Sequence, residues 1–556
     1  MLSVRKGNFA TTQFLIGIVL LLGALTFYYF AVLNIDYYKT GLLDLGWSDP
    51  SQYFAQAKAI MKDGYPYLNF GYQKLPSMYP PGYPALMLPW LKVLPEADSI
   101  LAPFRTNQTI GLLLLLATFV FYCYLQIPLT GGFAALLLAT LPGFFTFCRS
   151  SLSELSASAL IVLAFMFAYL GLKEERRWKI YLSAIFLGLS LDIRVQSLFF
   201  APLLLAMALF PSHGNQLRWF LHCFALMAVF ALALSPSLVL NTIQFHSPFI
   251  TGYDFWFAAN RPVRSAIFTP GHIPNNVVSL WRELTLRPRP FSVRNFGTGT
   301  SFVAPFVLLV CAGTALIRLN RFVICAFVAG LSFFALTSSM MPEWVDGRYY
   351  LPLLILLVAV AVLPVMWAVE NLFVARRAVP SLGIFVLFAT ACLGYPSRSL
   401  FNIPQAVGFG SQTERNRFQA WDALHFPNQP SQSPWLTAQK HFLTTFGRQP
   451  GIILTDINPL FLNALLPDPF VAAPLDGERY VRFRNAGFRN VPTYDRAQAL
   501  ALVKHGLDQS RPVYALFVSQ NEMDEKARRL PQIDGYEWVV AENLPAEAVV
   551  LKLSPK

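Results

Sequence analysis

Charged residues are scarce in this chain. Only 13% of its 556 residues are Asp, Glu, Lys or Arg, whereas 55% are hydrophobic and the mean hydropathy is +0.46. A water-soluble protein of this composition could not cover its apolar surface, so we expect an α-helical polytopic membrane protein. The net charge of +13 is not accompanied by a zinc spacing, an RNA-binding signature or a basic-aromatic stripe, which disfavours a nucleic-acid partner.

Several chemical signatures are also missing. The six cysteines all lie in apolar stretches and do not have the spacing of a disulfide framework or a metal site. The sequence contains no Gly-rich phosphate loop, no Ser-His-Asp elbow motif and no Asp-x-Asp pair. Soluble nucleotide-sugar transferases commonly use an Asp-x-Asp pair to hold a metal and a diphosphate. Its absence therefore disfavours a cytosolic nucleotide donor.

Long apolar runs predict about eleven membrane spans. They fall near residues 12–33, 106–125, 131–148, 152–171, 178–193, 197–211, 219–241, 301–317, 322–339, 351–369 and 379–395. Residues 1–395 are therefore predicted to form a transmembrane domain with a first outer loop at 34–105 and a long outer loop at 244–296. The apolar piece 85–94 is too short to span and is interrupted by Pro89, which favours an interfacial or re-entrant helix.

The distribution of Lys and Arg predicts the orientation. With the N-terminus in the cytoplasm, every short inside loop but one carries a positive charge, as the positive-inside rule requires. We expect a multi-pass protein of the cell inner (plasma) membrane, with residues 396–556 on the periplasmic or extracellular side. Apolar runs and a helical pattern predict a soluble α/β domain there, with strands at 451–455, 512–518, 537–540 and 548–553 and a helix at 494–507.

Two acids stand in outer loops. Asp49 precedes Pro50 at a helix-start pattern, where it is either a helix cap or a functional acid. Glu154 lies at the outer mouth of the fourth span, where an ionisable residue is either interfacial or functional. Because the predicted orientation places both on one face, we predict that Asp49 and Glu154 are catalytic. If a divalent metal ion takes part, these two acids are its candidate ligands.

Arginines and aromatic residues accompany these acids on the outer face. Lipid headgroups explain many outer arginines, but a guanidinium also binds phosphate in a bidentate fashion. We predict a donor-phosphate role for Arg348, Arg261, Arg264 and Arg194. Aromatic rings here either form the interfacial belt or stack on sugars. The predicted substrate-pocket residues are Trp47, Tyr53, Tyr79 and Tyr83.

The order of these elements resembles the GT-C superfamily of integral-membrane glycosyltransferases, which includes protein O-mannosyltransferases and the lipid A aminoarabinose transferase. After the first span, the matching elements are Ser48-Asp-Pro-Ser-Gln-Tyr53, Tyr79-Pro-Pro-Gly-Tyr-Pro84, Glu154 and Arg348-Tyr-Tyr-Leu-Pro352. The chain differs from the family at Pro50, where many members have Asp-Glu, and at Tyr79, where the aminoarabinose transferases have a lysine. The resemblance covers about the first 395 residues.

The resemblance implies a hexosyl- or pentosyltransferase that takes a sugar from a polyprenyl-phosphate donor and passes it to a lipid, glycan or protein acceptor. A lipid phosphate leaves without help from an acid, so this step needs a base for the acceptor hydroxyl and cations for the phosphate. We therefore predict an inverting transfer with Asp49 as general base; a retaining route would need a carboxylate nucleophile. The alternatives are a polytopic transporter or lipid flippase, and a non-catalytic envelope assembly protein.

Overall fold

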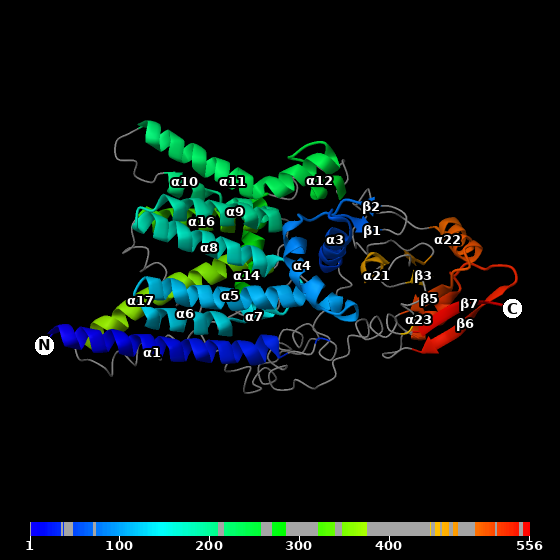
Figure 1. Cartoon of the computed structure of the whole chain (residues 1–556), viewed down its shortest axis with the longest axis horizontal. Helices are drawn as coiled ribbons and strands as arrows, with labels where there is room; N and C mark the ends of the chain where they lie inside the picture. Colours follow the sequence, from blue (N-terminus) through cyan, green and yellow to red (C-terminus); the bar gives the residue numbers. More distant parts are fainter. Residues whose placement is uncertain are drawn as a thin grey trace. The chain divides into compact units, whose positions relative to one another are not determined.

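The chain divides into two compact units in the computed structural model (Figure 1). Unit 1 comprises Met1–Ile35, Asn107–Ser235 and Arg264–Pro427, and unit 2 comprises Asp36–Thr106, Pro236–Val263 and Asn428–Lys556. The structure describes residues 2–34, 37, 48–69, 74–208, 216–256, 269–284, 321–339, 347–374, 445, 451–455, 459–465, 471–475, 495–517, 520–543 and 549–556. The units therefore group segments predicted as outer loops with the C-terminal part of the chain, whereas the predicted domains 1–395 and 396–556 follow the chain order.

Unit 1 is built of helices, most of them apolar. They are α1 (Leu2–Tyr28) with the π-helical turn η1 (Tyr29–Leu33), α6 (Pro128–Thr140), α7 (Pro142–Cys148), α8 (Glu154–Lys173), α9 (Arg177–Ile193), η3 (Val195–Phe200), α10 (Pro202–Ala208), η4 (Pro270–His272), α14 (Ile273–Leu284), α16 (Arg321–Ser338), η5 (Gly347–Tyr350) and α17 (Leu351–Val374). Two further helices, α5 (Ala102–Tyr124) and α11 (Gln216–Phe245), continue from one unit into the other.

The expected polytopic membrane fold is confirmed. In the described part of the chain, four helical segments are long and apolar enough to cross a membrane: Thr11–Leu33, Asp98–Tyr124, Glu154–Lys173 and Gln216–Phe245. The predicted spans at 301–317 and 379–395 lie outside the described residues. The total of about eleven spans therefore stays a prediction.

Glycines allow α1 and α6 to pack backbone against backbone. A Cβ atom on Gly132 would lie 2.2 Å from the carbonyl oxygen of Gly17, and one on Gly17 would lie 2.5 Å from that of Pro128. Lipid is as apolar as the side chains, so membrane helices associate through close van der Waals contact, which small residues permit. This crossing is part of a buried core that also includes side chains of α5, α7, α8 and α17.

Prolines interrupt the helices at positions that differ from the sequence prediction. The stretch predicted as one span at 131–148 contains two helices, because α6 ends at Thr140 and α7 begins at Pro142. Leu141 is extended (φ −67°, ψ 119°), as the steric demand of a following proline requires. In unit 2, by contrast, Pro89 does not interrupt helix α4 (Gly82–Val93). Pro89 is exposed there, so the helix continues across one missing hydrogen bond.

The C-terminal part of unit 2 is an α/β domain. Its sheet has the order β4-β3-β5-β7-β6. The elements are β3 (Ile452–Thr455), α21 (Pro459–Leu465), β4 (Val471–Pro474), α22 (Arg496–Asp508), β5 (Val513–Phe517), α23 (Gln520–Ala527), β6 (Tyr536–Asn543) and β7 (Val549–Pro555). The first three strands in this order are parallel, and β7 and β6 are antiparallel additions. The predicted α/β architecture, its four strands and its helix are confirmed, whereas the short strand β4 was missed; the predicted bounds 396–556 stay a prediction.

Unit 2 also contains the elements formed by the segments predicted as outer loops, including the helix that carries Asp49. They are α3 (Ser48–Asp63), β1 (Leu68–Asn69), β2 (Lys74–Leu75), α4, η2 (Glu96–Leu101) and α12 (Gly252–Trp256). A Cβ atom on Gly252 would lie 1.9 Å from the carbonyl oxygen of Ser77, so the start of α12 lies directly on the loop between α3 and α4. Asn463 of α21 donates a hydrogen bond to the carbonyl of Asn69 (3.3 Å), which connects the sheet domain to the same loop.

Candidate active site

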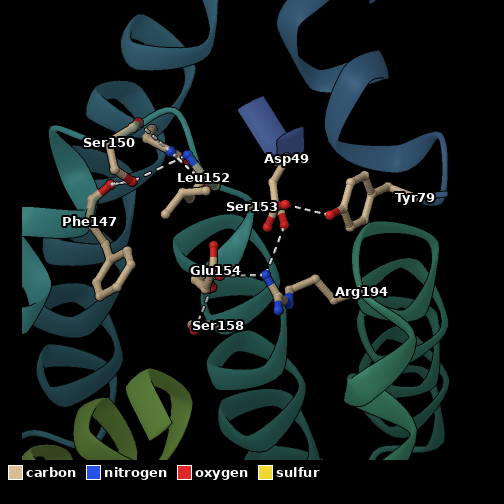
Figure 2. Close-up of polar contacts among 10 residues, drawn as sticks. Asp49, Tyr79, Phe147, Ser150, Leu152, Ser153, Glu154, Ser158 and Arg194 are labelled. Carbon is tan, nitrogen blue, oxygen red and sulfur yellow. Dashed lines mark hydrogen bonds and ion pairs between the residues drawn. The ribbon is translucent and has the colours of Figure 1, made fainter. Parts of the chain in front are cut away.

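Asp49 lies in the first turn of α3, as predicted. Pro50 follows it, at a position where the missing N–H of proline costs nothing. A carboxylate at this end of a helix is stabilised by the partial positive charge of the unpaired N–H groups. The hydroxyl of Tyr79 donates a hydrogen bond to Asp49 Oδ1 at 2.5 Å (Figure 2). This contact fixes the orientation of the carboxylate.

Tyrosine rings pack against Tyr79. Its ring centroid is 4.8 Å from that of Tyr53 and 5.7 Å from that of Tyr253. Tyr53 in turn contacts the ring of Tyr83 edge-on at 5.1 Å, and both Tyr53 and Tyr83 are buried. These two predicted pocket residues therefore support Tyr79, while their contact with a substrate stays a prediction. Trp47 lies outside the described residues.

The environment of Tyr79 keeps its hydroxyl protonated. Burial raises the pKa of Tyr79 well above its ordinary value, and the neighbouring Asp49 carboxylate raises this pKa further. Both causes act in the same direction, because both penalise the tyrosinate anion. Tyr79 is therefore a hydrogen-bond donor to Asp49 throughout the neutral pH range.

A buried amide network, which sequence reasoning missed, holds the backbone beside Tyr79. Ser77 Oγ donates to Gln52 Oε1 (3.0 Å) and accepts from Gln56 Nε2 (2.8 Å). The backbone N–H groups of Met78 and Tyr79 donate to Gln52 Oε1 (3.0 Å) and to Ser77 Oγ (3.1 Å). Gln52 and Gln56 lie one turn apart on α3, a spacing that places both on one face. Two glutamines at this spacing beside apolar residues were the available signal.

Glu154 and Arg194 form an ion pair in unit 1. Glu154 is the first residue of α8, and Arg194 directly follows the last residue of α9. The short connection between these helices brings the two ends together. Arg194 Nη1 lies 2.6 Å from Glu154 Oε1 and donates to Ser153 Oγ at 3.2 Å (Figure 2). Each charge also stands at the helix end whose dipole favours it.

This ion pair is buried. The side chains of Glu154 and Arg194 are 2% and 12% exposed. Removing two charges from water is costly, and direct pairing at hydrogen-bond distance offsets that cost. The guanidinium also lies over the ring of Tyr349, 5.2 Å from its centroid. A hollow of about 20 Å³ beside the pair has room for about one water molecule.

The remaining predicted residues divide as follows. Arg261, Arg264 and the side chain of Arg348 lie outside the described part of the chain. Asp49 belongs to unit 2 and Glu154 to unit 1, and their convergence stays a prediction. Among the described residues, no three His, Cys, Asp or Glu side chains gather closely enough to hold a metal ion.

The sequence matches no protein-family model and no curated protein, whereas the fold is similar to solved structures over most of the chain. Apo ArnT from Cupriavidus metallidurans, a lipid A aminoarabinose transferase, aligns with a TM-score of 0.58 at 12% identity, covering 96% of this chain and 97% of ArnT. ArnT bound to undecaprenyl phosphate gives a TM-score of 0.55 at 11% identity with the same coverage.

A second relative by fold is the archaeal oligosaccharyltransferase AglB from Archaeoglobus fulgidus, in complex with an inhibitory peptide and a dolichol-phosphate. Its TM-score is 0.51 at 13% identity, covering 91% of this chain and 70% of AglB. ArnT and AglB are both GT-C proteins. The chain therefore has the GT-C fold, which confirms the resemblance predicted from its sequence at the level of fold.

Proposed function

We propose that this protein is a membrane glycosyltransferase that moves a sugar from a polyprenyl-phosphate donor to an acceptor hydroxyl on the outer face of the membrane. The observation that carries the proposal is Asp49, a carboxylate in the first turn of α3 that Tyr79 orients, in a chain with the GT-C fold. ArnT and AglB have been solved with undecaprenyl phosphate and dolichol-phosphate, and this supports a lipid-phosphate donor.

Asp49 acts as the general base in the proposed reaction. The acceptor oxygen attacks the anomeric carbon, and the bond between that carbon and the phosphate oxygen breaks, with its electrons going to the phosphate. The proton of the acceptor hydroxyl goes to Asp49, so charge and atoms balance. Attack opposite the leaving phosphate inverts the anomeric configuration. Tyr79 is a positioning residue, because its protonated hydroxyl keeps the carboxylate in one orientation.

Arg194 is proposed to bind the donor phosphate, with Glu154 as its positioning residue. The planar fork of N–H donors on a guanidinium matches the oxygens of a phosphate, which is the chemistry that the donor phosphate requires. Glu154 is given no proton-transfer role, because its carboxylate is held 2.6 Å from the Arg194 guanidinium. The hollow beside the pair is water-sized, so phosphate binding requires the Tyr349 ring or the guanidinium to move.

A divalent metal ion fits Glu154 poorly. Its carboxylate already lies 2.6 Å from a guanidinium, and a second cation on the same oxygens would compete with that contact. No step of the proposed transfer depends on a metal. A transfer assay with and without EDTA tests this directly.

Sugar transfer by the purified protein in proteoliposomes is the test. The donors are radiolabelled hexosyl and pentosyl polyprenyl phosphates, and native membrane vesicles supply acceptors. Transfer that disappears in Asp49→Asn is the expected result. Its matched control is Asp254→Asn, because Asp254 also lies in the first turn of an outer-loop helix, where it accepts from Thr251 N and Oγ1 (both 2.9 Å).

Equal activity in the two variants would mean that Asp49 is only a helix cap. Movement of the donor between leaflets without transfer would support the transporter instead. A wild-type protein that inserts into the proteoliposomes but neither transfers sugar nor moves the donor would support an assembly role.

A further inference from the structure

A second hollow lies in unit 2, at the end of α3 opposite to Asp49. Its volume is about 310 Å³, at the lower end of the range of ligand pockets. Asp63 and Asp49 are separated by about 21 Å along the helix at ~1.5 Å per residue. The hollow is lined by Asp63, Tyr65, Tyr67, Lys74, Pro76 and Gln244. It is therefore a site separate from the carboxylate of the proposed reaction.

The polar groups of this hollow form one cluster. Asp63 Oδ2 accepts hydrogen bonds from Tyr67 Oη (2.6 Å) and Lys74 Nζ (2.9 Å). Lys74 Nζ also lies 4.2 Å from the centroid of the Tyr67 ring. Because these two hydrogen bonds lower the pKa of Asp63, its carboxylate is ionised at neutral pH. The opposite charges of Asp63 and Lys74 cancel, which favours a neutral polar ligand over a phosphate.

The walls of the hollow are held in place by contacts with the backbone. Gln244 Nε2 donates to the carbonyl of Pro66 (3.1 Å), and Trp256 Nε1 donates to the carbonyl of Pro76 (2.9 Å). Tyr67 is only 5% exposed and forms part of the floor, whereas Tyr65 is half-buried. A pocket whose walls are already ordered loses little conformational entropy when it binds.

We propose that this hollow binds a sugar ring of the acceptor, and hence that the acceptor is an oligosaccharide or a glycolipid. A sugar presents hydroxyls that both donate and accept, together with an apolar C–H face. Asp63 accepts, Lys74 donates, the carboxamide oxygen of Gln244 accepts, and the tyrosine rings supply a flat apolar wall. The inference rests on the proposed function, because the bound glycan must extend along α3 to offer its hydroxyl to Asp49.

Binding of the full-length protein to a glycan array tests the proposal without requiring transfer. The probes are purified cell-envelope oligosaccharides, and the protein is wild type, Asp63→Asn or Tyr65→Ala in detergent. We expect at least tenfold weaker binding by both variants, because each loses a direct contact with the sugar. The control is Glu96→Gln: Glu96 is also an exposed acid paired with a lysine, Lys58, but it does not line the hollow.

Asp49→Asn separates this inference from the proposed function. It is expected to abolish transfer and to bind glycans as the wild type does. In the transfer assay, Asp63→Asn should raise KM for the acceptor about tenfold and leave kcat and the donor KM unchanged. Glycan binding that is absent, or equal in wild type and both hollow variants, would overturn the proposal even if transfer is observed. Retention of peptides in place of glycans, lost in the same variants, would assign the hollow to a protein acceptor and overturn it as well.

Discussion

Asp49 and Glu154 each stand in the first turn of a helix, but the groups that hold the two carboxylates differ in kind. One contact of Asp49 is the hydroxyl of Tyr79, a neutral donor. One contact of Glu154 is the guanidinium of Arg194, a cation, inside a bundle of apolar helices. A hydroxyl orients a carboxylate without neutralising it, whereas a guanidinium in a buried pair neutralises it. The comparison supports the proposal that Asp49 takes the proton and that Glu154 positions the phosphate ligand Arg194.

The surroundings of the two acids also differ. Asp49 is held through an outer loop whose backbone is fixed by neutral amides, Gln52 and Gln56. Losing one such hydrogen bond costs about 1 kcal/mol, so this part of unit 2 tolerates change. The pair in unit 1 has no such tolerance, because removing one charge leaves the other buried.

The largest expected effect on rate is that of Asp49→Asn. General-base catalysis contributes about 10²–10⁴-fold, so kcat should fall by that factor. Asparagine can still accept from Tyr79, and the fold should be unchanged. Glu154→Gln should act mainly by raising the donor KM, because it loosens Arg194. Initial rates over a matrix of donor concentrations separate the two results. An equal fall of kcat in both variants at saturating donor would contradict the distinction between Asp49 as general base and Glu154 as a positioning residue.

The largest expected effect on stability belongs to unit 1. Arg194→Met leaves Glu154 buried without the guanidinium and should cost about 3–5 kcal/mol. In the double variant with Glu154→Gln neither charge of this pair is left, and much of that stability should return. Detergent-solubilised protein is followed by its apparent melting temperature. If the losses in the two single variants simply add in the double variant, the two side chains do not act as a pair.

Tyr79→Phe should lower kcat about tenfold or more, since it removes a hydrogen bond to a charged group and keeps the ring packing on Tyr53. Burial and Asp49 keep the pKa of Tyr79 high, so the hydroxyl does not lose its proton when the pH is raised moderately above neutral. If kcat falls at high pH, the midpoint of that fall should therefore be the same in wild type and in Tyr79→Phe. A fall at high pH that is present in wild type and absent from Tyr79→Phe would show that Tyr79 itself titrates.

The sequence was sufficient for the features that depend on local pattern. Apolar runs and proline positions predicted most helices, four of the five strands of the sheet domain and the helix start at Asp49. Glu154 was found because an acid at the edge of a span is unusual. Its partner Arg194 was assigned only to phosphate, because the pairing depends on how α8 and α9 meet. The Ser77 network and the hollow beside Asp63 depend on how the loop folds onto α3. The spacing of residues along the sequence does not predict that fold.

The smallest effect tests whether the loop network matters for the proposed reaction. Gln56→Ala removes one hydrogen bond to Ser77 and leaves the bonds of Gln52 in place, so about 1 kcal/mol of stability should be lost. Gln498→Ala is a matched control, because Gln498 Oε1 accepts from Asp495 N (3.0 Å) in the capping box of α22 and its loss should cost a similar amount. Only Gln56→Ala should also lower kcat, by a few-fold, since only its network fixes the backbone of Tyr79. Equal kcat in the two variants would mean that Tyr79 orients Asp49 through its ring packing alone.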